Sequence, residues 1–276
     1  MYRPLGATFA AALATMVYLP GAAHASPSVD NIAHRGGAAY APENTIAACT
    51  MAWMQRADAC EFDIQQTKDQ QLVLIHDQTL SRTTNVEQVF PDRSPWRVAD
   101  FTLEEIRRLD AGSWFSSGFR GEKVPTLGEA LQAMRRYGIG LLLEIKHSPG
   151  NGGIDQRVAN VLRQNRSLWS GRGLVVQAFD WNAMRSFHRM VPEVPITLLG
   201  KPDLSKLSDL GTFAKGISVP RSSLTPELVR TVHGKGMRVY TGPTDRPVVM
   251  RRLVSYGVDA IMTNRPGQLD SIKRYW

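Results

Sequence analysis

The sequence predicts an α/β fold, a (β/α)8 TIM barrel with a small insertion after the third strand region. Short runs of valine, isoleucine and leucine alternate with amphipathic stretches along the chain, and this alternation is typical of a parallel sheet covered by helices. About eight such units in about 250 residues fit a closed barrel better than an open sheet. The chain of 276 residues is long enough to bury the core of one large domain.

Residues 1–25 have the pattern of a secretory signal peptide. Arg3 gives a positive start, Leu5–Leu19 is apolar without an acid, and Ala23-His24-Ala25 offers a small-x-small cleavage site. We therefore expect an exported protein, periplasmic or secreted, whose mature domain covers residues 26–276. The alternative is an uncleaved membrane anchor, and no later segment is long and apolar enough to span a bilayer.

The expected elements follow one another in the order that a barrel needs. The predicted strands are Ile32-Ala33, Glu61–Gln65, Leu72–Ile75, Leu141–Ile145, Leu174–Val176, Ile196–Leu199, Gly216–Val219, Arg238–Thr241 and Ala260–Thr263. The predicted helices cover residues 45–55, 102–109, 126–137, 154–165, 181–190, 225–234 and 246–255, the first with Asn44 as its expected N-cap.

Nine predicted strands compete for eight places in the barrel. The second and third have no helix between them, only the turn-prone Thr67–Gln70 segment, so we expect them to form a hairpin. That hairpin would bring His76 back beside Glu61 and Asp63. Residues 78–125 then form an irregular insertion, and a long loop at the active end of a barrel is often a substrate lid.

Charge and cysteine content set further bounds. The formal net charge is +8, but the basic residues are dispersed, with isolated pairs at Arg135-Arg136 and Arg251-Arg252. We therefore expect a solvated basic surface and no nucleic-acid partner, and the oligomeric state is left open. Export permits a disulfide between Cys49 and Cys60, yet their apolar surroundings favour two separate buried thiols.

Carboxylates and histidines gather where predicted strands end, which is where a barrel keeps its active site. Glu61 and Asp63 lie on the same side of one strand because strand side chains alternate with period two. Glu144 interrupts an apolar strand and would add a third carboxylate, a set that suits Ca²⁺ or Mg²⁺. The competing interpretation is a solvated rim at Glu61 and Asp63 that binds nothing.

Four more residues are of the types that could bind a phosphate group or transfer protons in a reaction at it. His34 and His76 each follow an apolar strand run and could act as a general acid and base pair, although a single histidine is more often structural. Arg35 and Lys146 could contact a phosphate group. Gly36-Gly37 would let backbone amides approach an anion, or could simply turn the chain.

These residues resemble the glycerophosphodiester phosphodiesterases, over about residues 30–270. The resemblance rests on an ordered set of motifs: His34-Arg35-Gly36-Gly37, Pro42-Glu43-Asn44-Thr45, Glu61-Phe62-Asp63, Thr67-Lys68-Asp69, His76-Asp77, Arg82-Thr83-Thr84-Asn85, Val124-Pro125-Thr126-Leu127, Leu143-Glu144-Ile145-Lys146 and Ile261-Met262-Thr263-Asn264-Arg265-Pro266. Each motif is weak by itself, and the ordered set is specific.

The resemblance implies metal-dependent hydrolysis of glycerophosphodiesters to sn-glycerol 3-phosphate and an alcohol. It makes His34 and His76 the catalytic acid and base, and it makes Glu61, Asp63 and Glu144 the ligands of Ca²⁺ or Mg²⁺. Arg35, Lys146 and Tyr240 would contact the substrate. Glu43 and Asn44 would not touch the substrate but would hold the residues that do. Tyr240 stands where the family commonly has tryptophan, and Asn264 where aspartate is frequent.

Two other functions compete with this interpretation. The same site could hydrolyse lysophospholipids or sphingolipids, as a lysophospholipase D or a sphingomyelinase D does, if Trp96, Trp114, Phe115 and Phe119 lined an apolar mouth; these rings could equally cap the barrel. The alternative of another class is a non-catalytic binding protein for phosphorylated ligands.

Overall fold

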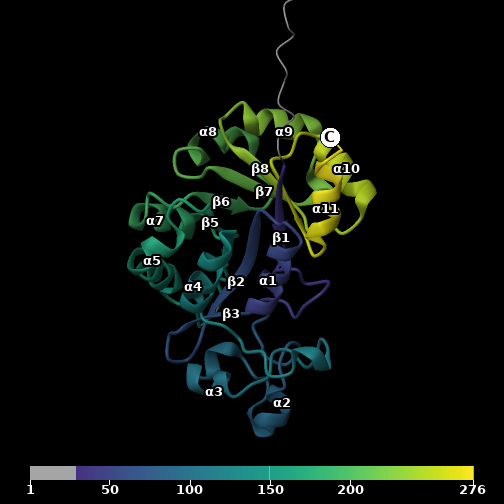
Figure 1. Ribbon diagram of the computed structural model, residues 1–276. Coiled ribbons are helices and arrows are strands. Elements are labelled where there is room, and N and C mark those ends of the chain that lie inside the picture. The colour runs from purple at the N-terminus through teal and green to yellow at the C-terminus, as the bar shows by residue number, and fades with distance from the viewer. Residues whose placement is uncertain (1–28, 149, 276) are drawn as a thin grey trace, which may run out of the picture.

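A computed structural model describes residues 29–148 and 150–275, and the predicted signal peptide lies outside these residues. Eight parallel strands close into a barrel in the order β1-β9-β8-β7-β6-β5-β4-β2, with β1 paired to β2 and β3 added at the edge of β2 (Figure 1). The predicted barrel is therefore confirmed. The strands are β1 (Asp30–Ala33), β2 (Ala59–Gln66), β3 (Leu72–Leu74), β4 (Gly140–Ile145), β5 (Leu174–Ala178), β6 (Ile196–Leu199), β7 (Gly216–Val219), β8 (Arg238–Thr241) and β9 (Ala260–Thr263).

Helices between the strands, and one helix after the last strand, cover the outside of the barrel (Figure 1). They are α1 (Ile46–Met54), α4 (Leu127–Tyr137), α5 (Ile154–Gln164), α6 (Arg166–Trp169), α7 (Trp181–Met190), α8 (Leu207–Leu210), α9 (Pro226–His233), α10 (Pro247–Ser255) and α11 (Pro266–Lys273). α6, α8 and α11 were not among the predicted helices.

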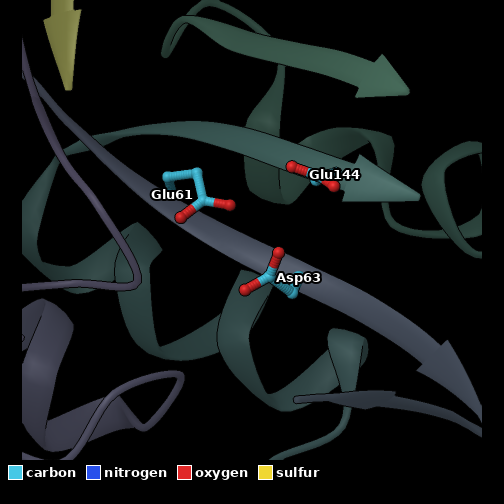
Figure 2. Close-up of side chains that lie close together, drawn as sticks. All are labelled: Glu61, Asp63 and Glu144. Carbon is cyan, nitrogen blue, oxygen red and sulfur yellow. The ribbon is translucent and has the colours of Figure 1, made fainter. Parts of the chain in front are cut away.

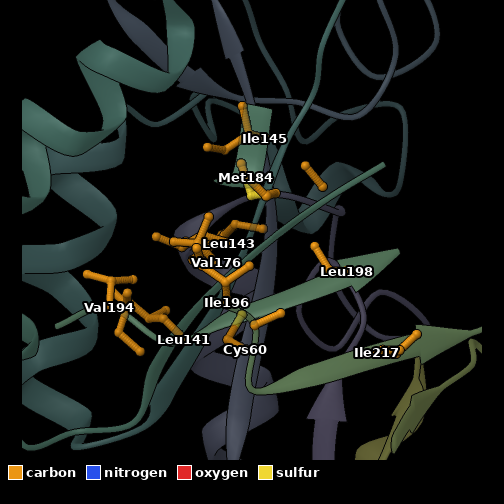
Figure 3. Packing of buried hydrophobic residues seen from close by; sticks show 14 of the residues in the cluster. Cys60, Leu141, Leu143, Ile145, Val176, Met184, Val194, Ile196, Leu198 and Ile217 are labelled. Atoms are coloured by element: carbon orange, nitrogen blue, oxygen red, sulfur yellow. The ribbon is translucent and has the colours of Figure 1, made fainter. Parts of the chain in front are cut away.

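Side chains alternate between the two faces of each strand, so that most of the hydrophobic core lies on the outer face of the sheet and the site residues lie on the inner face. Leu141, Leu143 and Ile145 of β4 point outward and pack in the large hydrophobic cluster between sheet and helices (Figure 3). Leu142 lies in a second cluster, inside the barrel, and Glu144 shares its side of the strand because side chains alternate. The same alternation in β2 directs Glu61 and Asp63 into the barrel while Cys60, Phe62 and Ile64 join the outer core.

The predicted hairpin is present. β3 pairs antiparallel with β2, Ile64 opposite Leu74, and the backbone N–H of Ile75 donates to the carbonyl of Asp63 over 2.9 Å. In the connecting turn Gln70 takes a positive φ of 62°, a conformation that favours glycine. The hairpin delivers His76 to the mouth of the barrel beside Asp63.

The segment after β3 forms a small lobe beside the barrel rather than a lid of bare loop (Figure 1). It contains α2 (Val86–Val89) and α3 (Leu103–Arg107) and has a hydrophobic cluster of its own around Phe101, Ile106 and Leu109. Trp96 packs on that cluster, while Phe115 makes edge-to-face contacts with both Trp114 and Phe119. None of these four rings lines the pocket at the mouth of the barrel or belongs to the hydrophobic clusters of the barrel.

The expectation of separate thiols was wrong. Cys49 in α1 and Cys60 in β2 are both fully buried, as predicted, but they form a disulfide with a Cα–Cα distance of 5.8 Å. Each burial pattern, taken by itself, is equally compatible with two separate thiols. The packing of α1 directly against β2 places the two side chains face to face.

Breaking this disulfide is expected to lower stability without removing the site. Closing a loop of about this size contributes about 3 kcal/mol in the chain-entropy model, and each kcal/mol shifts the melting temperature of a protein of this size by about 2–4 °C. A reducing agent should therefore lower the melting temperature of the wild type and leave a Cys49→Ala/Cys60→Ala variant unaffected. Equal melting temperatures in the presence and absence of reductant would contradict the bond.

Candidate active site

A pocket of about 220 Å³ opens at the carboxyl ends of the barrel strands. One wall is charged and the opposite wall is mainly apolar. The charged wall consists of His34, Arg35, Glu61, Asp63, His76, Glu144 and Lys146, and the other contains Phe179, Leu199, Val219, Pro220, Pro243 and Met262. The structure thus brings together both predicted histidines, all three predicted metal ligands and both predicted phosphate contacts.

Three carboxylates lie at the centre of the charged wall. Glu61 and Asp63 project from β2 and Glu144 from the neighbouring β4 (Figure 2), and one oxygen of each lies within 4.8 Å of the others. All three are buried. Burial raises the pKa of Glu61 well above its usual value, with Asp63 and Glu144 adding to the effect, and burial also raises the pKa of Glu144.

This carboxylate set fits a divalent cation. Three buried acids repel one another unless positive charge lies between them, and hard cations such as Ca²⁺ and Mg²⁺ take carboxylate oxygens. Within the protein, Lys146 contacts both Asp63, over 2.9 Å, and Glu144. These contacts raise the pKa of Lys146 despite its burial.

Asn44 holds the central acid in place. Its side-chain amide donates to Asp63 Oδ2 over 2.8 Å and its Oδ1 accepts from the backbone N–H of Asp63 over 2.9 Å. Asn44 is therefore not the N-cap of α1; that role belongs to Thr45, whose side chain accepts from the N–H of Ala48. The two hydrogen bonds fix Asp63 on the strand at the height of Glu144.

Arg35 connects the acids to Glu43. Its backbone N–H donates to Glu61 over 2.6 Å, and its guanidinium lies 2.9 Å from Glu43 and 3.3 Å from Asp63. The adjacent glycines do not present free amides to an anion, because Gly36 donates to Ala33 and Gly37 to Ala48. A side chain at Gly36 would collide with Ala48 at 2.5 Å, so this glycine permits the close approach of α1.

His34 hydrogen-bonds to a neutral side chain. Its Nδ1 lies 2.9 Å from Oδ1 of Asn264, and the Asn264 amide in turn donates to Asp245 over 2.9 Å. Burial lowers the pKa of His34, and the charge of Arg35 lowers it further. His34 therefore favours the neutral form that can accept a proton.

His76 has a charged partner instead. Its Nδ1 lies 2.7 Å from Asp77, which Arg82 also binds, over 2.6 Å. The hydrogen bond from Arg82 lowers the pKa of Asp77 to about 2, and His76 contributes to this shift. Arg82 reaches across to Glu43 over 2.7 Å, so one arginine of the insertion joins the partners of His76 and Arg35.

Of the three predicted substrate contacts, Arg35 and Lys146 line the pocket and Tyr240 does not. Its ring packs inside the barrel beside Ile32 and Leu142, with the guanidinium of Arg238 5.4 Å from the ring centroid. The pocket is lined two and three residues farther along the chain, by Gly242 and Pro243. Alternation predicts which face of the strand Tyr240 occupies, but not how near the mouth it lies.

Sequence reasoning also missed several neighbours of the site. Gln177 lines the pocket beside Glu144, and its Oε1 has no hydrogen-bond partner. Phe179 lies at the rim and is 69% exposed. Gln177 could have been found by alternation along β5, whereas the roles of Arg82, Asp245 and Asn264 depend on loop conformation that no pattern in the sequence specifies.

Comparison with known proteins agrees with this geometry. The profile of the Glycerophosphoryl diester phosphodiesterase family matches residues 34–268. The chain belongs to this family. A glycerophosphodiester phosphodiesterase from Caldanaerobacter subterraneus subsp. tengcongensis is 34% identical over 249 residues, which cover 88% of this chain and 97% of that protein. One from Bacillus subtilis is 30% identical over 260 residues, covering 88% of this chain and 86% of that protein.

Solved structures of the family share the fold. A phosphodiesterase from Oleispira antarctica, in complex with the product sn-glycerol-3-phosphate, superposes with a TM-score of 0.78 at 28% identity, covering 88% of this chain and 95% of that one. A glycerophosphodiester phosphodiesterase from Agrobacterium tumefaciens superposes with a TM-score of 0.73 at 27% identity, covering 88% of this chain and 99% of that one. Within residues 29–148 and 150–275, no helix combines the length and apolar character needed to cross a membrane.

Proposed function

We propose that this family member hydrolyses glycerophosphodiesters to sn-glycerol 3-phosphate and an alcohol, with a divalent cation at Glu61, Asp63 and Glu144. The observation that carries the proposal is the meeting of two histidines with this carboxylate set in one pocket. The product named for the Oleispira antarctica relative supports the same substrate class.

Each residue of the charged wall has a task in the proposed reaction. A bound Ca²⁺ or Mg²⁺ would withdraw charge from the phosphoryl oxygens. Arg35 and Lys146 bind those oxygens and orient the diester. One histidine accepts the proton of the attacking oxygen and the other protonates the leaving alkoxide. The attacking oxygen belongs either to water or to the neighbouring hydroxyl of the glycerol, and in the second case water then opens the cyclic phosphate. Asn44 holds Asp63 in position for these contacts, and Glu43 holds Arg35.

We also propose that the protein acts outside the cytoplasm. The signal pattern in residues 1–25 supports export, and the disulfide between Cys49 and Cys60 suits an oxidising compartment. Calcium and magnesium are both proposed as cofactors, because three carboxylates accept either ion.

A lysophospholipase D activity is the second candidate, favoured by the exposed ring of Phe179 beside the apolar wall. We expect glycerophosphocholine to be hydrolysed with a kcat/KM at least about tenfold above that of lysophosphatidylcholine, since the pocket is too small to bury an acyl chain of typical length. Release of sn-glycerol 3-phosphate and of choline would be measured with each substrate. The reverse preference would make the lipid activity primary, and no turnover with any metal would favour a binding protein.

A further inference from the structure

The hydrogen bonds of His34 form a chain that ends in a carboxylate. The backbone N–H of His34 donates to the carbonyl of Thr263 over 2.9 Å, and the pairing of β1 with β9 places Ala33 opposite Thr263. Asn264, the next residue after β9, therefore lies directly beside the imidazole. Asp245 reaches the same amide from the loop after β8.

Asp245 determines which way the Asn264 amide faces. Its carboxylate accepts from three groups: the Thr263 hydroxyl at 2.9 Å, the backbone N–H of Asn264 at 2.8 Å and the side-chain amide of Asn264 at 2.9 Å. These hydrogen bonds outweigh burial and lower the pKa of Asp245, so it is an ionised acceptor. Because a carboxylate cannot donate, the NH₂ group of Asn264 must face Asp245 and its Oδ1 must face His34.

The orientation of the Asn264 amide then determines which ring nitrogen of neutral His34 carries the proton. Oδ1 of Asn264 can only accept, so the proton of neutral His34 resides on Nδ1, at 2.9 Å. Nε2 is left with a free lone pair as the nitrogen available to a ligand in the pocket that His34 lines. In serine proteases, the wrong histidine tautomer lowers kcat by about four orders of magnitude.

We propose that Asp245 and Asn264 are positioning residues that hold His34 in the Nδ1–H tautomer, Asp245 acting through Asn264. Neither residue lines the pocket, so both act through His34 rather than on the substrate. The inference rests on the proposed function only for its effect on turnover, because the tautomer itself is a property of the free protein.

The test replaces Asp245 by its uncharged isostere. In Asp245→Asn the amide of Asn264 loses the partner that fixes its direction, and an NH₂ group turned toward His34 favours the Nε2–H tautomer. Nitrogen-15 spectra of histidine-labelled protein, at a pH where the imidazole is neutral, distinguish the tautomers, and the His34 signals are assigned by their absence in His34→Ala. We expect Nδ1–H in the wild type, a mixture or Nε2–H in Asp245→Asn, and a fall in kcat of about 10- to 1000-fold with KM within about threefold.

Thr263→Val is the matched control. It removes another hydrogen bond of Asp245 but leaves the chain from Asp245 through Asn264 to His34, so the tautomer and kcat should match the wild type. An unchanged Nδ1–H signature in Asp245→Asn would overturn the proposal, whether or not kcat falls. A wild type that shows the Nδ1–H signature but hydrolyses no phosphodiester would refute the proposed function and leave the positioning role supported.

Discussion

Chelation of divalent cations is expected to abolish turnover, and Ca²⁺ or Mg²⁺ is expected to restore it. Glu61, Asp63 and Glu144 bring three buried carboxylates within 4.8 Å of one another, and the side chains of Arg35 and Lys146 form ion pairs with this set. We expect EDTA to reduce kcat/KM for glycerophosphocholine by at least about 100-fold. Recovery on titration with each metal would be followed through the release of sn-glycerol 3-phosphate.

Glu61→Gln tests the ligand assignment within the same experiment. Loss of one carboxylate should raise the metal concentration for half-maximal activity by about 10- to 100-fold or more. Glu227→Gln, on the outer surface of α9, is the control and should titrate as the wild type does. Full activity of EDTA-treated protein, or equal metal requirements in both variants, would rule out this metal site.

The direction of the pH effect on metal binding follows from the raised pKa values. Burial raises the pKa of Glu61 and of Glu144, so protons compete with the cation at a higher pH than they would at exposed carboxylates. As the pH falls through these values, the half-maximal metal concentration should rise. The increase should be smaller in Glu61→Gln, which has one competing proton fewer.

Much of the site could be predicted because two simple geometric rules position it. Period-two alternation places Glu61 and Asp63 on one face, and the missing helix between two predicted strands indicates the hairpin that returns His76. Barrel closure then brings Glu144 and Lys146 beside them, with Asp63 opposite Glu144 in the register of β2 and β4. These are properties of regular strands, and a sequence specifies regular strands well.

The residues that were missed or misplaced depend on irregular backbone. Asn44 has a positive φ of 58°, which turns its side chain from the start of α1 toward Asp63. Arg82 and Asp245 lie in loops whose course is set by packing rather than by periodicity. The strand pattern predicts which face of β8 Tyr240 occupies but not how far it lies from the mouth of the barrel. The disulfide was missed because the pairing of Cys49 with Cys60 depends on how α1 packs against β2.

Replacing either pocket histidine with alanine is expected to reduce kcat by at least about 100-fold while the fold is retained, because general acid–base catalysis contributes about 10²–10⁴. His233→Ala is the matched control, since His233 pairs with Asp259 and does not line the pocket. Circular dichroism and melting temperature would verify folding. Near-normal turnover in both His34→Ala and His76→Ala would refute the assignment.

A change of leaving group should separate the roles of the two histidines. Burial lowers the pKa of His34 and Asn264 gives it a neutral partner, which suits a base. His76, whose Nδ1 lies 2.7 Å from the Asp77 carboxylate, is then left with the role of the acid. A p-nitrophenyl diester needs no proton on its leaving group, so it should recover most of the rate lost in His76→Ala and little of that lost in His34→Ala. Recovery in His34→Ala instead would reverse the roles, and equal recovery in both would show that neither histidine alone protonates the leaving alkoxide.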